Sequence, residues 1–280
     1  MSLRGRPAGW RTAAIASPAW QAIAGGLRTI ALALLAAGLL SLPAAPAGAA
    51  TNAAQKVAVY RGAAGCRGCS EMVVDALRAT GLPLTIVYVG EREPLHVTPA
   101  TLRDVDLYIQ PGGGQDIAAA YAALGDEGAA ALRDFVSGGR GFLGLCMGAY
   151  LADRDGIGLV DVALQSEVGR PRSGIGDEGD HTIAIRWDGT WQRVYYQDGP
   201  FLTGSAADGF VPIARYGNGD VAIARYRHGR GTVVLAGPHP EADERWMDAA
   251  ADVAPQDNLR RLLRLFPGLG ARAEARPALR

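Results

Sequence analysis

The chain has 280 residues, of which 49% are hydrophobic, and its 28 basic residues balance its 28 acidic ones. This length allows one sizeable domain or two small ones, and a balanced charge without a basic stripe argues against nucleic-acid binding. The four histidines and three cysteines lack the spacing of metal ligands, so we expect no metal site and no cofactor.

Residues 1–49 have the pattern of a signal peptide. Four arginines precede an apolar block at residues 29–40, and small residues at 47–49 resemble a cleavage site. The apolar block is short for a membrane span. We therefore expect a secreted or extracytoplasmic protein, mildly acidic once the leader is removed, that touches a membrane only if the leader stays uncleaved as an anchor.

Residues 50–55 are expected to be a linker, residues 56–267 the folded domain, and residues 268–280 a disordered tail rich in Arg, Ala and Pro. In the first half of the domain, short apolar runs alternate with segments of helical spacing. The expected strands are 56–60, 84–89, 105–109 and 142–145, and the expected helices are 70–80, 98–102, 116–124 and 126–137. This alternation predicts an α/β fold with a doubly wound, mostly parallel sheet, whose active site lies beyond the carboxyl ends of its strands.

The pattern changes after residue 152, where strand-like runs are separated by turns rich in Gly, Asn, Asp and Pro. The expected strands here are 159–168, 181–186, 193–196, 210–216 and 220–226. They predict an antiparallel β excursion attached to the main sheet. A buried strand at 231–236 follows, and then two expected helices at 242–253 and 256–265.

Cys146 stands at the end of one of these apolar runs, with Gly144 two residues before it and Gly148 two residues after it. This is the pattern of a nucleophile elbow, in which a buried strand turns sharply into a helix at the nucleophile. The N-terminal end of the following helix would favour a thiolate. The alternative is a buried structural cysteine beside a glycine-rich strand.

A cysteine nucleophile needs a base, and the base needs an orienting group. His239 ends the buried strand 231–236, and Glu241 lies two residues further, where its carboxylate can turn back onto the imidazole. The alternative for this pair is a loop with a glutamate that caps a helix. The other histidines, at positions 96, 181 and 228, stand in loops or turns and are expected to be solvated.

Acyl transfer also needs donors for the oxyanion. The N–H of Met147, directly after the nucleophile, is one candidate. The run Gly112-Gly113-Gly114 follows an expected strand and could supply the second donor from Gly113, with Gly112 and Gly114 lining the substrate pocket. The triple glycine alone is equally compatible with a plain turn.

Three of these motifs, in this order, resemble the class I glutamine amidotransferase-like superfamily: Pro111-Gly-Gly, Gly144-Leu-Cys-Met-Gly148 and His239-Pro-Glu241. Further runs are similar to the N-terminal domain of eukaryotic biotin–protein ligases and its free-standing bacterial relatives, over residues 56–265. These runs are Val59-Tyr-Arg-Gly62, Ile109-Gln-Pro-Gly-Gly-Gly114, Phe135-Val-Ser-Gly-Gly139, Cys146-Met-Gly-Ala-Tyr150, Tyr195-Tyr-Gln-Asp-Gly-Pro200 and Gly237-Pro-His-Pro-Glu241. The resemblance implies a flavodoxin-like fold with Cys146 as nucleophile, His239 as base, Glu241 as orienting group and the N–H groups of Gly113 and Met147 as oxyanion donors.

Two features depart from that family. Glutamine amidotransferases usually carry a glutamine shortly after the nucleophile, where this chain has Ala149-Tyr150. They also pass ammonia to a synthetase, and neither a synthetase partner nor a biotin ligase domain is evident in this sequence. The resemblance therefore does not imply glutamine-dependent synthesis or biotin attachment.

Three functions remain open from the sequence. The first is an exported cysteine hydrolase of an amide, peptide or acyl substrate. The second is a non-catalytic binding module for a small molecule or a protein, with a pocket lined by Tyr150, Tyr195 and Tyr196. The third is redox chemistry at Cys66-x-x-Cys69, although a structural disulfide between these two, with Cys146 left as the free thiol, is the preferred interpretation.

Overall fold

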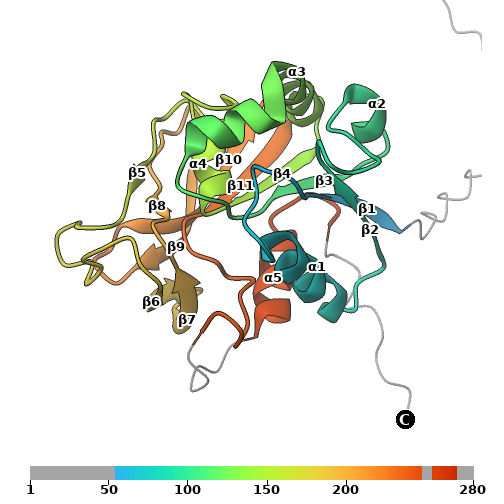
Figure 1. Cartoon of the computed structure of the whole chain (residues 1–280). Coiled ribbons are helices and arrows are strands. Elements are labelled where there is room, and N and C mark those ends of the chain that lie inside the picture. The colour runs from blue at the N-terminus through green and yellow to red at the C-terminus, as the bar shows by residue number, and fades with distance from the viewer. Residues whose placement is uncertain (1–53, 248–253, 270–280) are drawn as a thin grey trace, which may run out of the picture. The chain divides into compact units, whose positions relative to one another are not determined.

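The computed structural model describes residues 54–247 and 254–269 (Figure 1). The chain divides into residues 1–51 and 52–280, and the described residues all belong to the second unit. The predicted leader, most of the predicted linker and the predicted tail from residue 270 lie outside them. Among the described residues, no helix combines the length and the apolar character needed to cross a membrane.

A nine-stranded sheet in the order β2-β1-β3-β4-β11-β10-β9-β6-β7 organises the domain. Its first five strands pair in parallel: β2 (Leu84–Val89), β1 (Gln55–Tyr60), β3 (Leu107–Gln110), β4 (Gly141–Leu145) and β11 (Gly231–Ala236). The next four continue antiparallel: β10 (Val221–His228), β9 (Val211–Tyr216), β6 (His181–Trp187) and β7 (Thr190–Tyr196). The short strands β5 (Gln165–Ser166) and β8 (Pro200–Phe201) form a separate pair. The fold is therefore α/β with a mixed sheet.

Helices cover both faces of the parallel half (Figure 1). One face carries α2 (Pro99–Leu102), α3 (Ile117–Ser137) and α4 (Met147–Leu151), and the other carries α1 (Cys69–Ala79) and α5 (Pro255–Leu263). Because side chains alternate along a strand, each strand feeds two cores. Tyr108 and Phe142 stack at 5.6 Å in the first core, whereas Ile109 and Leu143 are buried in the second.

The predicted strands and helices of the first half are confirmed within one or two residues. The two helices expected at 116–124 and 126–137 join into α3 across a kink at Gly125, whose φ of 73° falls in the left-handed region that glycine adopts without strain. The kink explains why the sequence pattern breaks at this position.

The strand predicted at 159–168 is wrong, since only Gln165–Ser166 pairs as a strand. The cause is Asp153, whose carboxylate accepts hydrogen bonds from the N–H groups of Asp155, Gly156 and Leu164. A side chain that takes up these backbone donors holds the segment in turns instead of a ladder.

The helix predicted at 242–253 is also wrong over residues 242–247, which form turns. The Asp243 carboxylate accepts hydrogen bonds from the backbone N–H and the guanidinium of Arg245, and this local bonding replaces the helical pattern. Residues 248–253 lie outside the described residues. The second predicted helix of this region is present as α5.

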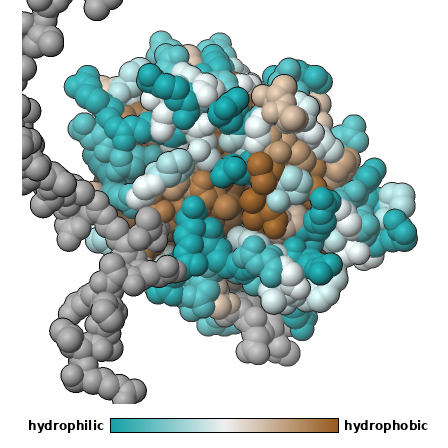
Figure 2. All heavy atoms as spheres, turned by 180° about the vertical axis from the view of Figure 1, so that it is seen from behind, coloured by the Kyte–Doolittle hydropathy of each residue, from teal (hydrophilic) through white to brown (hydrophobic). Residues whose placement is uncertain are grey.

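Figure 2 shows the face seen from behind, on which hydrophilic residues surround a central hydrophobic area. Within the described residues, the large hydrophobic side chains that are exposed are Leu95, Trp191 and Val211. The remaining large hydrophobic side chains are partly or fully buried, mostly in the two cores on either side of the sheet and a few in a small third cluster around Tyr195.

Candidate active site

Cys146 lies at a sharp bend between β4 and α4, with φ of 51° and ψ of −111°. Such angles are strained for a residue with a side chain and are found at functional sites. The backbone N–H of Cys146 donates to the carbonyl of Ala236 at 2.8 Å, which ties the bend to the end of β11. Two parallel strands thus hold the cysteine in its strained conformation.

The two glycines that flank Cys146 are required by close backbone packing. A Cβ at Gly144 would overlap the carbonyl of Gly148, and a Cβ at Gly148 would overlap the carbonyl of Gln110 at the end of β3. No side chain fits at either position. The turn therefore has the geometry that the glycine spacing predicts.

His239 lies three residues after β11, and its backbone N–H donates to the carbonyl of Tyr195 at the end of β7 at 2.8 Å. Its Nδ1 lies 2.8 Å from Oε1 of Glu241. A carboxylate can only accept, so Nδ1 carries the hydrogen and Nε2 is the nitrogen available to other groups. Both side chains are buried, and the Asn258 amide donates to the carbonyl of Pro240 between them at 3.0 Å. The predicted pair is therefore preassembled.

Burial alone lowers the pKa of His239, but interactions with Glu241 and Cys146, with hydrogen bonds to both, raise it to about 10. These interactions bring Cys146 and His239 into one electrostatic unit. The imidazole of His239 therefore keeps its second proton at neutral pH, next to the carboxylate of Glu241. The second carboxylate oxygen of Glu241 is buried and has no hydrogen-bond partner within the described residues.

The glycine run after β3 touches both the base and the nucleophile segment. A Cβ at Gly112 would overlap the ring of His239, and one at Gly113 would overlap the side chain of Met147. Gly114, in contrast, has nothing within 4 Å of a Cβ position. The run is thus not a plain turn at its first two glycines. Within the described residues, the N–H groups of Gly113 and Met147 have no hydrogen-bond acceptor, which leaves both free to bind a substrate oxygen.

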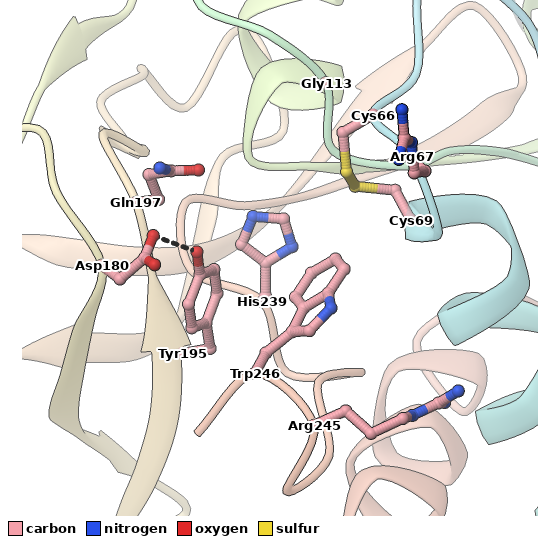
Figure 3. Close-up of a pocket in the computed structure, with 10 residues that line it drawn as sticks. All are labelled: Cys66, Arg67, Cys69, Gly113, Asp180, Tyr195, Gln197, His239, Arg245 and Trp246. Atoms are coloured by element: carbon pink, nitrogen blue, oxygen red, sulfur yellow. Dashed lines mark hydrogen bonds between the residues drawn. A yellow bond between two sulfur atoms is a disulfide. The ribbon is translucent and has the colours of Figure 1, made fainter. Parts of the chain in front are cut away.

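Two cavities meet at Gly113 and Gln197. One, of about 320 Å³, contains His239, Tyr195 and the disulfide (Figure 3). The other, of about 300 Å³, contains Cys146, Met147, Gly114 and Tyr150. The nucleophile and the base therefore face adjoining cavities that share one wall.

Cys146 is 6% exposed as a residue, and its Sγ donates to the carbonyl of Gln197 at 3.2 Å. Tyr195 lines the cavity of His239, as predicted for the binding pocket. Tyr196 does not fit that prediction, because its ring is fully buried against Tyr216 and its hydroxyl donates to the carbonyl of Gly199.

Aromatic rings surround the base. Tyr195 and Trp246 each lie 5.4 Å from His239, ring centroid to centroid, and 5.2 Å from each other. The hydroxyl of Tyr195 donates to the carboxylate of Asp180 at 2.6 Å (Figure 3). These contacts fix the ring of His239 and leave its cavity with an aromatic wall and a carboxylate.

Cys66 and Cys69 form a disulfide with their Cα atoms 5.3 Å apart, and Cys146 is a free cysteine. The other histidines lie elsewhere: His181 bonds to Asp177, and Nδ1 of His228 lies 3.1 Å from the carbonyl of Leu159. No cluster of three or more potential metal ligands is found within the described residues.

The sequence interpretation missed several residues that line the two cavities. Among them are Arg67, Asp180, Gln197, Asp198, Arg245 and Trp246. Gln197 and Asp198 stand in one of the runs that resemble the amidotransferase-like family, but nothing in that run indicated contact with Cys146. The others carry no local pattern and are placed by the fold alone.

A solved structure described as a glutamine amidotransferase is 17% identical, with a TM-score of 0.50, covering 66% of this chain and 90% of that one. This chain has a glutamine amidotransferase-like fold.

Two other similar structures have TM-scores below 0.5. An exo-beta-1,4-mannosidase from an Opitutaceae bacterium is 15% identical (TM-score 0.46), covering 75% of this chain and 36% of that one. A cytoplasmic protein from Salmonella typhimurium is 10% identical (TM-score 0.47), covering 76% and 98%. No protein-family model and no curated protein matches this chain.

Proposed function

We propose that this chain is a cysteine hydrolase of an amide or acyl substrate. Cys146 is the nucleophile, His239 the acid and base, and Glu241 the group that orients the imidazole. The observation that carries the proposal is the pairing of a strained cysteine at an elbow with a buried His239–Glu241 hydrogen bond of 2.8 Å. The raised pKa of His239, caused by Glu241 and Cys146 despite burial, supports an imidazolium–thiolate pair as the resting state.

In the reaction, the Cys146 thiolate attacks the substrate carbonyl carbon and the carbonyl electrons move to oxygen. The N–H groups of Gly113 and Met147 stabilise this oxyanion. Nε2 of His239 gives its proton to the leaving amine as the tetrahedral species collapses to a thioester. The neutral imidazole then takes a proton from water, which attacks the thioester, releases the acid and restores the thiolate. Throughout, Glu241 holds Nδ1–H and keeps the ring oriented.

The substrate in this proposal is a small molecule or a short peptide segment, because each of the two adjoining cavities has about 300 Å³. Ala149-Tyr150 in place of a glutamine argues against an ammonia donor for a synthetase. We further propose that the domain is a doubly wound, flavodoxin-like member of the biotin–protein ligase N-terminal-domain family, exported by the leader at residues 1–49. The order of the five parallel strands and the sequence runs quoted above support this.

A second function, a non-catalytic binding module, is favoured by one observation. The Cys146 thiol is almost buried and donates its hydrogen to the carbonyl of Gln197, which is a satisfied structural arrangement. In this alternative the cavities bind a ligand, and the bend at Cys146 serves only to hold the fold together. The two functions differ in whether His239 changes the reactivity of Cys146.

The deciding experiment is the rate of iodoacetamide labelling of Cys146 as a function of pH. The disulfide leaves Cys146 as the only free cysteine of the chain, so the label reports on it alone. For the hydrolase we expect a labelling rate at pH 6 within about threefold of that at pH 8, because the imidazolium sustains the thiolate. His239→Ala should reduce the rate at pH 6 at least tenfold.

His181→Ala is the matched control, since it removes a histidine that bonds to Asp177 and lines neither cavity. It should leave the profile unchanged. A rate that rises about tenfold per pH unit in wild type, and is the same in His239→Ala, would contradict the hydrolase and favour the binding module.

A further inference from the structure

The Cys66–Cys69 disulfide lies in the wall of the cavity that contains His239 (Figure 3). A Cβ at Gly112 would overlap the His239 ring and would lie 3.4 Å from Sγ of Cys69, so this glycine separates the imidazole from the disulfide. The N–H of Cys66 also donates to the carbonyl of Gly112 at 3.1 Å. The disulfide is thus part of the site, although the proposed hydrolysis does not use its sulfurs.

The two cysteines differ in accessibility and in surroundings. Cys66 is half-buried, whereas Cys69 is 1% exposed and is the first residue of α1, an 11-residue helix. The positive end of that helix stabilises a thiolate at Cys69. A thiolate that enters the cavity therefore reaches Cys66 first, and Cys69 is the better leaving sulfur.

Arg67 strengthens this asymmetry. It stands between the two cysteines, is exposed and lines the same cavity. In the described part of the chain, its guanidinium makes no ion pair with a carboxylate, whereas Arg245 across the cavity is paired with Asp75 and Asp243. A free cation beside a disulfide attracts an incoming thiolate and stabilises the one released.

This disulfide contributes less to the stability of the fold than a long-range one would. The two residues are three apart in sequence, and so short a loop restricts the unfolded chain less than a long-range link would. The start of α1 is also held without it, by the hydrogen bond from the Ser70 hydroxyl to the carbonyl of Tyr60 at 2.7 Å.

We propose that Cys66–Cys69 is a redox-active disulfide that a low-molecular-weight thiol reduces through the His239 cavity. The thiolate attacks Sγ of Cys66, the bond between Cys66 and Cys69 breaks, and Cys69 leaves as a thiolate with the bonding electron pair. A second thiolate attacks the external sulfur of the mixed disulfide and releases Cys66 as a thiolate. The two protons of the thiols end on Cys66 and Cys69, the protein gains two electrons, and the two thiols are oxidised to one disulfide.

The first test measures reduction of the folded protein by glutathione, in the Cys146→Ser background so that the result is independent of the proposed hydrolase. Samples are quenched with N-ethylmaleimide, and the added groups are counted by intact mass. We expect the reduction rate of the native protein to be at least one tenth of that in denaturing urea. A native rate below that limit would mean a protected structural disulfide and would overturn the proposal.

The second test separates the two sulfurs, also in the Cys146→Ser background. When glutathione reacts with the intact disulfide and N-ethylmaleimide stops the reaction, the mixed disulfide should carry glutathione on Cys66 and the maleimide on Cys69, as read from peptide masses. Equal amounts of glutathione on the two cysteines, or more on Cys69, would overturn the assignment of Cys66 as the attacked sulfur. Arg67→Gln should slow glutathione reduction of the intact disulfide at least threefold, with Arg245→Gln as the paired-arginine control, and an unchanged rate in Arg67→Gln would remove Arg67 from the proposal.

Discussion

The parallel and antiparallel halves of the sheet both border the candidate site, and a buried glutamate with an unpartnered oxygen lies beside each. Beside the parallel half, Glu241 is held against His239, which balances its charge. Glu167 follows β5 and lies against the turn between β9 and β10 of the antiparallel half, where it accepts a hydrogen bond from Asn218 at 2.7 Å and faces the carboxylate of Asp220. The first arrangement positions the imidazole of His239 as a proton donor, whereas the second buries a carboxyl group next to another carboxylate. Burial of a carboxyl group is thus not by itself an indication of chemistry.

The halves also differ in how they reach the cavities. The parallel half contributes residues at the carboxyl ends of its strands, namely Cys146 after β4, the glycine run after β3 and His239 after β11. The antiparallel half contributes Tyr195 and the residues directly after β7, which close the site from the other side. We infer that the parallel half carries the chemistry and that the antiparallel half shapes the wall, and the predictions below test that division.

The largest expected effect is on the elbow of the parallel half. Gly148→Val places a side chain on the carbonyl of Gln110 and should lower the free energy of unfolding by roughly 3 kcal/mol or more. Urea unfolding followed by circular dichroism measures it. Gly114→Ala is the control, since nothing lies within 4 Å of its Cβ position, and it should change stability by less than about 0.5 kcal/mol. Similar effects of the two substitutions would show that the elbow is not tightly packed.

The second prediction concerns the pH dependence of stability that His239 confers. Glu241 and Cys146 raise the pKa of His239 to about 10 despite burial, above its unfolded value of about 6.5. The folded state then holds a proton that the unfolded state releases. This contribution is complete below pH 6.5 and is lost as the pH rises towards 10.

Between pH 6.5 and pH 10, the free energy of unfolding of wild type should therefore fall by roughly 1–3 kcal/mol more than that of His239→Gln. Urea unfolding at each pH measures this difference. Cys146→Ser removes one source of the raised pKa and should give an intermediate loss. Parallel curves for wild type and His239→Gln would mean that the imidazole is neutral in the folded protein.

Glu167, which lies against the antiparallel half, gives a smaller effect over a different pH range. Burial first, and then the charge of Asp220, raise its pKa to about 7. Its folded pKa lies above the unfolded one, so its contribution is present below about pH 4.5 and is lost as the pH rises towards 7. Glu167→Gln keeps an acceptor for Asn218 and should raise stability at pH 8 by roughly 1 kcal/mol, without altering Cys146 labelling. A changed labelling rate would contradict the division between the halves.

The site residues of the parallel half could be picked out from the sequence because they stand in local patterns. Gly144 and Gly148 around Cys146 report a bend that only small residues allow, and His239 and Glu241 lie two residues apart. Gln197 and Trp246 could not be predicted, because their contacts with the site depend on how β7 and the segment after β11 come together. The two wrong elements, at 159–168 and 242–247, failed at Asp153 and Asp243, whose carboxylates bind the backbone in a way that apolar periodicity does not report.

The smallest effect is expected at the wall of the His239 cavity. Tyr195→Phe removes the hydrogen bond to Asp180 and should cost about 1 kcal/mol of stability. The ring remains, so its packing against His239 and Trp246 is preserved, and Cys146 labelling should change less than about threefold. Tyr121→Phe, which removes an exposed hydrogen bond to Asp126, is the control and should cost less than about 0.5 kcal/mol. A tenfold fall in labelling with Tyr195→Phe would mean that the Tyr195–Asp180 pair acts on the thiolate through His239. In that case the antiparallel half would take part in the proposed reaction, together with Cys146, His239 and Glu241.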